Sequence, residues 1–399
     1  MKKTLAAVAV LGAFAGSAMA ANVELYGSVS TGLVFTHTDS TDEASATNSM
    51  TMESAWAGDS VFGLTGEEEL GNGWKVGFAL ENEFSSDTGA LANDGKLFDS
   101  MSYLWVGNDI VKVAAGNLGG ALSSGGGDFD LVGGFDPLEA AYGNGGMGLF
   151  ASKDAAYDNA IGVEVTPVDG LKISFQASLE DEDQNSGWSQ RTHYYGLGAA
   201  YENGPLAVAA VVERVKPQNG KTFYASPVYN DNDDEISETG PATEYKTAKY
   251  YTLGASWDFE VIKPTIMYQH ADDISISSFA GGAIMEAGSF KFNGNEYTTD
   301  NALSKSDSIL IGATAPLGNG TLGVSAQYAQ VKLADVDADA DADEDNKGNA
   351  YVFGIAYSYE LSKRTNLYAA GVYSHGTKAF KDVDTVNNYQ IGFGLNHTF

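Results

Sequence analysis

The chain has 399 residues and no cysteine, which excludes both a disulfide framework and a thiolate metal site. Its 53 acidic and 22 basic residues give a formal net charge of −31, which repels nucleic-acid phosphates and attracts cations. The 21 Tyr and 19 Phe residues argue against a disordered chain, because disordered sequences are poor in aromatic residues.

The first twenty residues have the layout of a secretory signal peptide. Lys2 and Lys3 form a basic start, an apolar stretch follows, and Ala18-Met19-Ala20 match a small-residue cleavage site. The apolar stretch is too short for a membrane-spanning helix, and no later segment has 18 apolar residues in a row. We therefore expect residues 1–20 to be removed on export. Residues 21–399 are expected to form one domain, because no linker divides them.

Apolar and polar residues alternate over stretches that are long for a β-strand. In 73–84, Trp74 and Phe78 fall on one face, while Lys75 and Glu81 fall on the other. The same alternation recurs in 23–35 and 171–180. Strands of soluble proteins usually have about 5–6 residues. Ten or more residues are the length that a tilted strand needs to cross a bilayer.

Short turns and long polar segments follow one another along the chain. The seven predicted turns lie at 70–73, 107–109, 167–170, 202–205, around 260, 316–320 and 360–365. The eight predicted loops are 37–59, 85–96, 118–147, 181–193, 216–248, 271–305, 332–349 and 376–387. Seven turns and eight loops separate sixteen strands, with both chain ends on the side of the short turns. Short turns on one side and long loops on the other are typical of outer-membrane barrels.

A closed antiparallel barrel satisfies the backbone hydrogen bonds of such strands in lipid, because closure removes the sheet edges. Sixteen strands enclose an aqueous channel, which the polar faces would line. The last strand, 387–399, places Tyr389, Ile391, Phe393 and the terminal Phe399 on one face. A soluble sandwich or propeller is the alternative, but it explains neither the loop asymmetry nor this last strand.

Several blocks of the sequence resemble the general porins of Gram-negative outer membranes, the trimeric sixteen-stranded type of β-proteobacteria. VELYGSVSTGL is similar to the family's first strand, and SVFGLTGEEELGNGWKVGFALENEF to its second and third strands. LSKRTNLYA, at 361–369, is the most specific internal block. The resemblance implies a homotrimer in the outer membrane, in contact with lipid and lipopolysaccharide. It also implies that Phe399 is the assembly signal read by the barrel-insertion machinery.

The resemblance implies a passive channel for small hydrophilic solutes, narrowed by a third loop that folds into the barrel. That loop is the glycine-rich segment 118–147. Its carboxylates, Asp128, Asp130, Asp136 and Glu139, are expected at the constriction.

The chain departs from the family where wall arginines are expected to oppose these carboxylates. Neutral residues stand at or near the expected arginine positions: Val61, Thr65, Ser100 with Met101, Asn117 and Gly162. The predicted wall charges are Lys75, Lys112 and Lys172 against Glu81, Glu83 and Glu164. Opposite charges interact more strongly in a narrow pore than in bulk water. We therefore expect selectivity for cations; weak selectivity with solvated carboxylates is the alternative.

Other functions are less favoured by the sequence. A solute-specific channel stays open, because the inward aromatics Tyr103 and Trp105 could stack on a sugar ring. An outer-membrane hydrolase would need a histidine beside a serine or aspartate; His37 and His375 lie near external strand ends without a companion motif. The acidic tract 335–345 lacks the spacing of an EF-hand, so we expect a solvated loop tip rather than a Ca²⁺ site.

Phosphate-binding motifs are present only as fragments. Gly143, Gly145 and Gly148 match G-x-G-x-x-G, but they lack the strand before and the helix after that a dinucleotide site requires. The GKT at 220–222 lacks the first glycine of a P-loop, because Val215 stands there. We expect no enzymatic activity, no cofactor and no metal.

Overall fold

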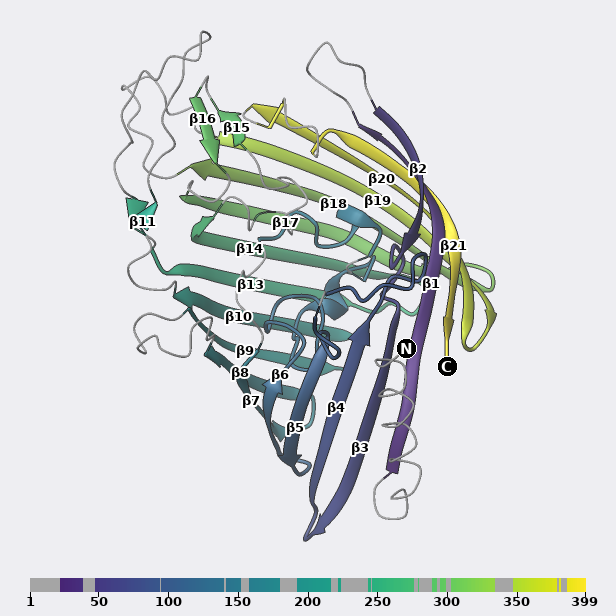
Figure 1. Cartoon of the computed structure of the whole chain (residues 1–399), viewed down its shortest axis with the longest axis vertical. Coiled ribbons are helices and arrows are strands. Elements are labelled where there is room, and N and C mark those ends of the chain that lie inside the picture. Colours follow the sequence, from purple (N-terminus) through teal and green to yellow (C-terminus); the bar gives the residue numbers. More distant parts are fainter. Residues whose placement is uncertain are drawn as a thin grey trace.

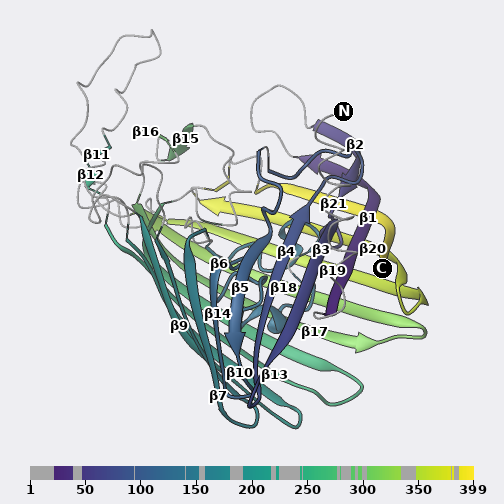
Figure 2. The same ribbon diagram turned by 60° about the horizontal axis from the view of Figure 1, so that its bottom comes forward.

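Long antiparallel strands form one sheet that closes on itself, because the first strand pairs with the last. The computed structural model describes residues 22–38, 47–93, 95–139, 141–151, 158–179, 192–216, 222–223, 243–244, 246–275, 279, 289–292, 295–298, 303–333, 347–378, 380–381 and 386–399. Figures 1 and 2 show the curved wall of strands. None of the described segments is a helix that is long and apolar enough to span a bilayer.

The wall consists of β1 (Asn22–Thr38), β2 (Thr47–Ser54), β3 (Val61–Gly71), β4 (Trp74–Glu83), β5 (Met101–Gly107), β6 (Val111–Asn117), β7 (Ala160–Val168), β8 (Leu171–Leu179), β9 (His193–Asn203), β10 (Leu206–Lys216), β13 (Ala248–Trp257), β14 (Lys263–Ser275), β17 (Leu303–Pro316), β18 (Gly320–Leu333), β19 (Lys347–Ser362), β20 (Thr365–Lys378) and β21 (Asn388–Thr398). Two small pairs lie outside the wall: β11 (Thr222–Phe223) with β12 (Thr243–Glu244), and β15 (Ser289–Phe292) with β16 (Asn295–Thr298). Two 3₁₀ turns, η1 (Gly133–Phe135) and η2 (Gly143–Gly145), lie between β6 and β7.

The second strand of the barrel is interrupted, which reconciles seventeen wall segments with sixteen strands. β2 pairs with the second half of β1 and β3 with its first half, so both occupy one position in the barrel. The prediction of a sixteen-stranded antiparallel barrel is confirmed. The prediction of a loop across 47–54 is wrong, because Met50 and Met52 alternate with polar residues and extend the wall.

All seven predicted short turns join neighbouring strands. They connect β3 to β4, β5 to β6, β7 to β8, β9 to β10, β13 to β14, β17 to β18 and β19 to β20. Thr398 donates its N–H to the carbonyl of Arg364 in the last of these turns. The C-terminus therefore lies on the side of the short turns, as predicted.

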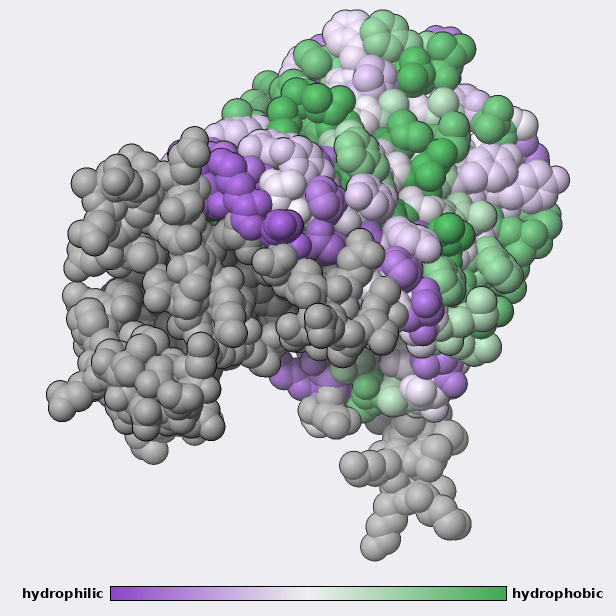
Figure 3. Space-filling view, turned by 90° about the horizontal axis from the view of Figure 1, so that it is seen from above, coloured by the Kyte–Doolittle hydropathy of each residue, from purple (hydrophilic) through white to green (hydrophobic). Residues whose placement is uncertain are grey.

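Most side chains on the outer face of the wall are apolar, and the inner face carries many polar side chains. Leu197, Leu253 and Phe393 are more than half exposed, whereas Gln176 and Gln269 on the opposite face are buried. Figure 3 shows hydrophobic residues over much of the described outer surface. An exposed apolar surface of this extent is stable in lipid and not in water.

Candidate functional site

The segment between β6 and β7 packs against the polar face of the wall. Ser325 Oγ donates to the carbonyl of Gly145 at 2.6 Å, and Ser308 Oγ donates to the carbonyl of Leu149 at 2.6 Å. The backbone N–H of Ala151 donates to Gln269 at 2.7 Å. These bonds reach β14, β17 and β18, far from the segment in sequence. We call the described residues 118–139 and 141–151 the inner loop.

Glycines in the wall make room for apolar side chains of the inner loop. A Cβ on Gly254 would lie 2.5 Å from the Phe135 ring, and a Cβ on Gly162 would lie 2.8 Å from the Phe129 ring. Both rings are buried. The wall therefore lacks side chains where the loop docks, and Phe129 covers one position where the resemblance implied an arginine.

Replacing Gly254 with alanine is expected to loosen the inner loop by about 1–3 kcal/mol, the usual cost of overpacking. The added methyl group overlaps the Phe135 ring, so the ring must move. Gly371→Ala is the matched control, because its Cβ would meet its nearest neighbours at 3.9 Å, an ordinary contact. Limited proteolysis of folded protein in detergent measures the effect. Equal cleavage rates in the inner loop of both variants would contradict the prediction.

The two carboxylates Asp130 and Asp136 hold the inner loop together. Asp130 accepts hydrogen bonds from the N–H groups of Gly125, Val132 and Gly133. Asp136 is 5% exposed and accepts N–H bonds from Leu138 at 2.9 Å and Met147 at 2.8 Å. Both residues were predicted to place their charges at the constriction. In the structure, their carboxylates accept backbone hydrogen bonds that fix the path of the inner loop.

Asp128 is the most accessible of the three aspartates. Its side chain is 44% exposed and lies 3.5 Å from Lys112 Nζ. Tyr103 donates its hydroxyl to the same carboxylate. Lys112 Nζ also lies 5.3 Å from the centre of the Phe129 ring, with the Tyr103 and Trp105 rings at 5.6 Å. The carboxylate thus faces one lysine in an aromatic surrounding.

A second group of carboxylates lies at the far end of β4 from its short turn. Glu81 is 9% exposed and accepts a hydrogen bond from Ser100 Oγ at 2.5 Å. The charged neighbours of Glu83 are Asp59, Asp99 and Glu81. Asp99 also accepts from the backbone N–H of Glu83 at 3.0 Å. This end of the inner wall is therefore acidic.

The predicted wall lysines Lys75 and Lys172 lie at the opposite end, next to the short turns. Lys75 Nζ is 2.8 Å from Glu67 and 3.4 Å from Glu69, and Lys172 Nζ is 3.2 Å from Glu164. Glu164 is thus paired, as is Lys75, and Lys172 also lines a cavity together with Asp130 and Phe135 of the inner loop. Because both lysines keep exposed side chains, their pairs are weak.

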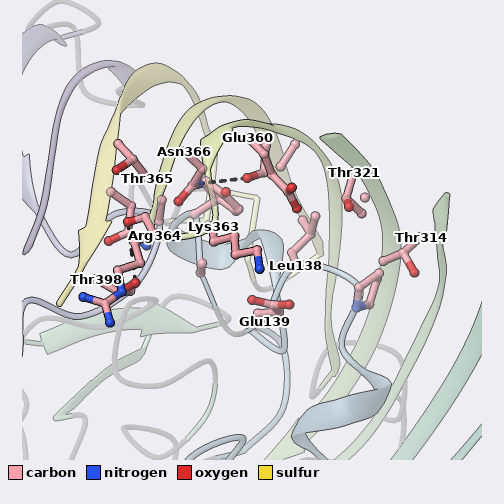
Figure 4. A pocket seen from close by; sticks show the side chains of 18 of the residues that line it. Leu138, Glu139, Thr314, Thr321, Glu360, Lys363, Arg364, Thr365, Asn366 and Thr398 are labelled. Carbon is pink, nitrogen blue, oxygen red and sulfur yellow. Dashed lines mark hydrogen bonds between the residues drawn. The ribbon is translucent and has the colours of Figure 1, made fainter. Parts of the chain in front are cut away.

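Three basic residues near the inner loop were not among the predicted site residues. Lys263 Nζ donates to the carbonyl of Gly134 at 3.3 Å. Lys363 and Arg364 line a cavity of about 530 Å³ beside Glu139, and Figure 4 shows Glu139 and Lys363 directed into the same space. The sequence block LSKRT contains two of these residues, but it was interpreted as a turn and as a family block, not as a source of pore charges.

An aromatic cluster connects the inner loop to Trp56, which lies between β2 and β3 where the second strand of the barrel is interrupted. The Trp56 ring packs edge-on against Tyr142, with centroids 5.3 Å apart, and Tyr368 of β20 lies 5.9 Å from Tyr142. The N–H of Tyr142 donates to the carbonyl of Trp56 at 2.6 Å. Burial and the nearby Glu139 charge raise the pKa of Tyr142 to about 12. Its hydroxyl therefore stays protonated to a higher pH than that of an unperturbed tyrosine.

The last residue takes part in closing the barrel. The N–H of Phe399 donates to the carbonyl of Gly27 at 3.0 Å, and the N–H of Gly27 donates back at 3.3 Å. A Cβ on Gly27 would lie 2.6 Å from the Phe399 ring. The terminal ring thus lies over the first strand at a position that only glycine fits.

Comparison with known proteins agrees with this architecture. Residues 6–379 match the family described as Gram-negative porin. The chain belongs to the Gram-negative porin family. The porin is 30% identical to an outer membrane porin protein of Bordetella pertussis and 27% identical to outer membrane porin protein 32 of Delftia acidovorans. Both alignments span 425 residues and cover all of each chain.

Solved structures share the fold of this porin. The anion-selective porin from Comamonas acidovorans superposes with a TM-score of 0.64 at 23% identity, over 95% of this chain and 100% of that one. A trimer form of OmpT from Vibrio cholerae gives 0.61 at 14% identity, over 95% and 100%. The family and the barrel place the porin in the Gram-negative outer membrane, with its strands crossing the bilayer.

Proposed function

We propose that the porin is a passive diffusion channel for small hydrophilic solutes and that it prefers cations. The inner loop forms the narrowest part of the channel in this proposal. Support comes from the polar inner face of a sixteen-stranded barrel, which is wide enough to hold water. The hydrogen bonds from the inner loop to β14, β17 and β18 support the position of the constriction.

The cation preference is argued from Asp128, because little positive charge lies beside its exposed carboxylate. Its cationic contact is Lys112 at 3.5 Å. Gly162, an expected arginine position, is covered by Phe129. We do not include Asp130 and Asp136 among the residues proposed to select ions, because their carboxylate oxygens accept hydrogen bonds from backbone N–H groups. Glu139 stays in the proposal as an exposed carboxylate at the cavity.

The acidic end of β4 extends this preference toward the outer mouth of the channel. Like charges close together attract counter-ions to their surroundings. Glu81 and Glu83 with Asp59 and Asp99 form such a set. The anion selectivity named for the Comamonas acidovorans porin belongs to that protein, since 23% identity carries the fold alone.

Ion selectivity in a planar bilayer tests the proposal. In a KCl gradient the wild-type porin is expected to show a reversal potential of cation-selective sign. The triple variant Glu81→Gln, Glu83→Gln, Asp128→Asn is expected to bring that potential most of the way to zero, because three unit charges leave the channel wall. The triple variant Asp109→Asn, Asp169→Asn, Glu260→Gln removes the same charge at the short turns and is the control. A wild-type preference for anions would refute the proposed selectivity.

A solute-specific channel is the second candidate. The cavity of about 530 Å³ beside the inner loop supports it, since donors and acceptors from Lys363, Arg364 and Asn366 meet there. Uptake by porin-containing liposomes that follows solute size alone argues for general diffusion, whereas one strongly favoured solute argues for the specific channel.

The proposal includes processing and assembly. Residues 1–20, which lie outside the described residues, are proposed to be a cleaved signal peptide. A homotrimer is proposed, supported by the trimer form of the related OmpT fold. Phe399 is proposed as the signal that the barrel-insertion machinery reads, supported by its place at the closure of the barrel.

A further inference from the structure

The cavity of about 530 Å³ lies between the inner loop and the short-turn end of the wall. Residues of β17, β18, β19, β20 and β21 line it, and Figure 4 shows their polar side chains around one space. Thr321, Ser358 and Thr398 supply hydroxyl groups, and Asn366 supplies an amide. A volume of this size is typical of sites for small molecules. The cavity can therefore hold a small solute that forms hydrogen bonds.

Charged residues of both signs line this cavity. Lys363 and Arg364 belong to the short turn between β19 and β20, and Glu360 is near the end of β19. Glu139 comes from the inner loop. None of these four side chains forms an ion pair with another residue that the structure describes, whereas Lys75, beside a different short turn, is paired. The cavity therefore offers positive and negative groups that do not neutralise one another by direct contact.

The backbone around Glu139 is fixed by its neighbours. The N–H of Glu139 donates to the carbonyl of Asp136 at 3.3 Å, and the N–H of Leu138 donates to the Asp136 carboxylate at 2.9 Å. Leu138 is buried against the wall, where a Cβ on Gly354 would lie 2.5 Å from its side chain. The carboxylate at position 139 is therefore presented to the cavity from a rigid support.

The backbone of Glu139 is also strained. Its φ is 54°, in the left-handed region that residues other than glycine seldom occupy. Strain of this kind persists only where the surrounding structure imposes it, and it clusters at functional sites. Glycine would adopt the same conformation without strain, so a glutamate here lowers the stability of the folded loop. A role of its carboxylate in binding explains that cost.

We propose that this cavity binds a free α-amino acid during its passage through the channel. The carboxylate of the amino acid lies against Lys363 and Arg364, and its ammonium group lies against Glu139. The hydroxyl and amide groups of the wall bind a polar side chain. A solute of one charge meets a like charge in the cavity, whereas a zwitterion finds a partner for both of its charges. The proposal rests on the passive-channel function and names the solute class for its solute-specific form.

The test measures binding of L-glutamine to the folded porin in detergent by ligand-observed NMR. Two derivatives of similar size each lack one charge: N-acetyl-L-glutamine lacks the ammonium group, and L-glutamine amide lacks the carboxylate. Each derivative is expected to bind roughly tenfold more weakly than L-glutamine, because one charge-assisted hydrogen bond is lost. If either derivative binds as tightly as L-glutamine, the proposal is wrong.

Two variants assign the charges of the solute to residues of the cavity. Glu139→Gln is expected to weaken binding of L-glutamine roughly tenfold and to leave the affinity for N-acetyl-L-glutamine almost unchanged, because that derivative has no ammonium group. The double variant Lys363→Gln, Arg364→Gln is expected to do the same for L-glutamine and to spare L-glutamine amide. A merely structural role of these residues would lower the affinity for all three compounds alike, and that result would overturn the proposal.

Matched controls remove the same charges at other places on the barrel. Glu260→Gln removes one carboxylate at the short turn between β13 and β14, and the double variant Lys75→Gln, Lys249→Gln removes two positive charges away from the cavity. Both controls are expected to keep the affinity of the wild type for L-glutamine. A tenfold loss in either control would show that the net charge of the barrel governs binding, and the assignment to the cavity would fail.

Uptake by porin-containing liposomes separates this proposal from the channel function on which it rests. Entry of glycerol, which has no charge, tests the open channel alone. Uptake of L-glutamine is expected to saturate with concentration in the wild type and to become proportional to concentration in Glu139→Gln. If glycerol enters and L-glutamine uptake never saturates, the channel function holds and the amino-acid site is refuted. If glycerol does not enter, the channel function itself is refuted.

Discussion

Replacing Glu213 with alanine is expected to raise the single-channel conductance of the porin several-fold while the barrel stays assembled. Glu213 is fully buried on the inner face of β10. It accepts hydrogen bonds from the N–H of Ser123 at 3.2 Å and from the Tyr194 hydroxyl at 2.8 Å, and Ser123 Oγ also donates to it. Each buried donor left without an acceptor costs about 1–3 kcal/mol. We therefore expect the first residues of the inner loop, around Ser123, to detach from β10 and move away from the wall.

The barrel itself should survive this substitution, because the backbone pairing of β10 with β9 and β13 does not involve the carboxylate. Val212→Ala is the matched control, since Val212 is the adjacent residue on the outward face and is 47% exposed. Planar-bilayer recordings give the conductance, and the mobility of unheated samples on a gel gives the assembled fraction. An unchanged conductance in assembled Glu213→Ala protein would show that this contact does not hold the loop.

Deleting Phe399 is expected to lower the yield of assembled barrel by on the order of tenfold, because the seam between β1 and β21 loses its last contacts. Two backbone hydrogen bonds with Gly27 are lost, at 3.0 and 3.3 Å. The ring that lies over Gly27 is lost as well. If the residue is also the signal for the insertion machinery, the defect in cells should exceed the defect in refolding from urea.

Phe393→Ala provides the control for this deletion. Phe393 lies on the same face of β21 and is 60% exposed, so its loss removes a ring of the same kind without altering the terminus. Heat-modifiable mobility of membrane fractions and of refolded protein measures assembly in the two settings. Normal assembly of the Phe399 deletion in both would leave the terminal residue without a role in closure.

The wall of the barrel was predictable because its signal is local. Apolar and polar residues alternate along most strands, and Gly and Asn occur at the turns. All seven short turns lie where they were expected. The missed segment, β2, has polar residues such as Asn48 and Thr51 among its methionines, so its pattern is weak. Its place in the wall depends on pairing with β1, which the sequence does not display.

The roles of the loop carboxylates were not predictable in the same way. Asp128, Asp130 and Asp136 have the same chemistry and lie within nine residues. Only the path of the backbone decides that Asp136 meets two N–H groups while Asp128 stays exposed. That path depends on distant contacts, such as Phe135 against Gly254. Residue types in the sequence were enough to locate an acidic, glycine-rich loop. Which of its aspartates bind backbone N–H groups and which stays exposed could be read only from the structure.

The hydrogen bonds of the inner loop also constrain the order in which the porin folds. Leu149 donates its N–H to Gln327 at 3.2 Å, and Gly145 accepts from Ser325, partners that lie 178 and 180 residues further along the chain. Contacts between such distant residues form late, because the intervening chain must be ordered first. The loop therefore reaches its final position only after β18 is in the sheet. Until then the inner loop is not fixed against the wall, so the interior of the growing barrel is more open during assembly than in the finished protein.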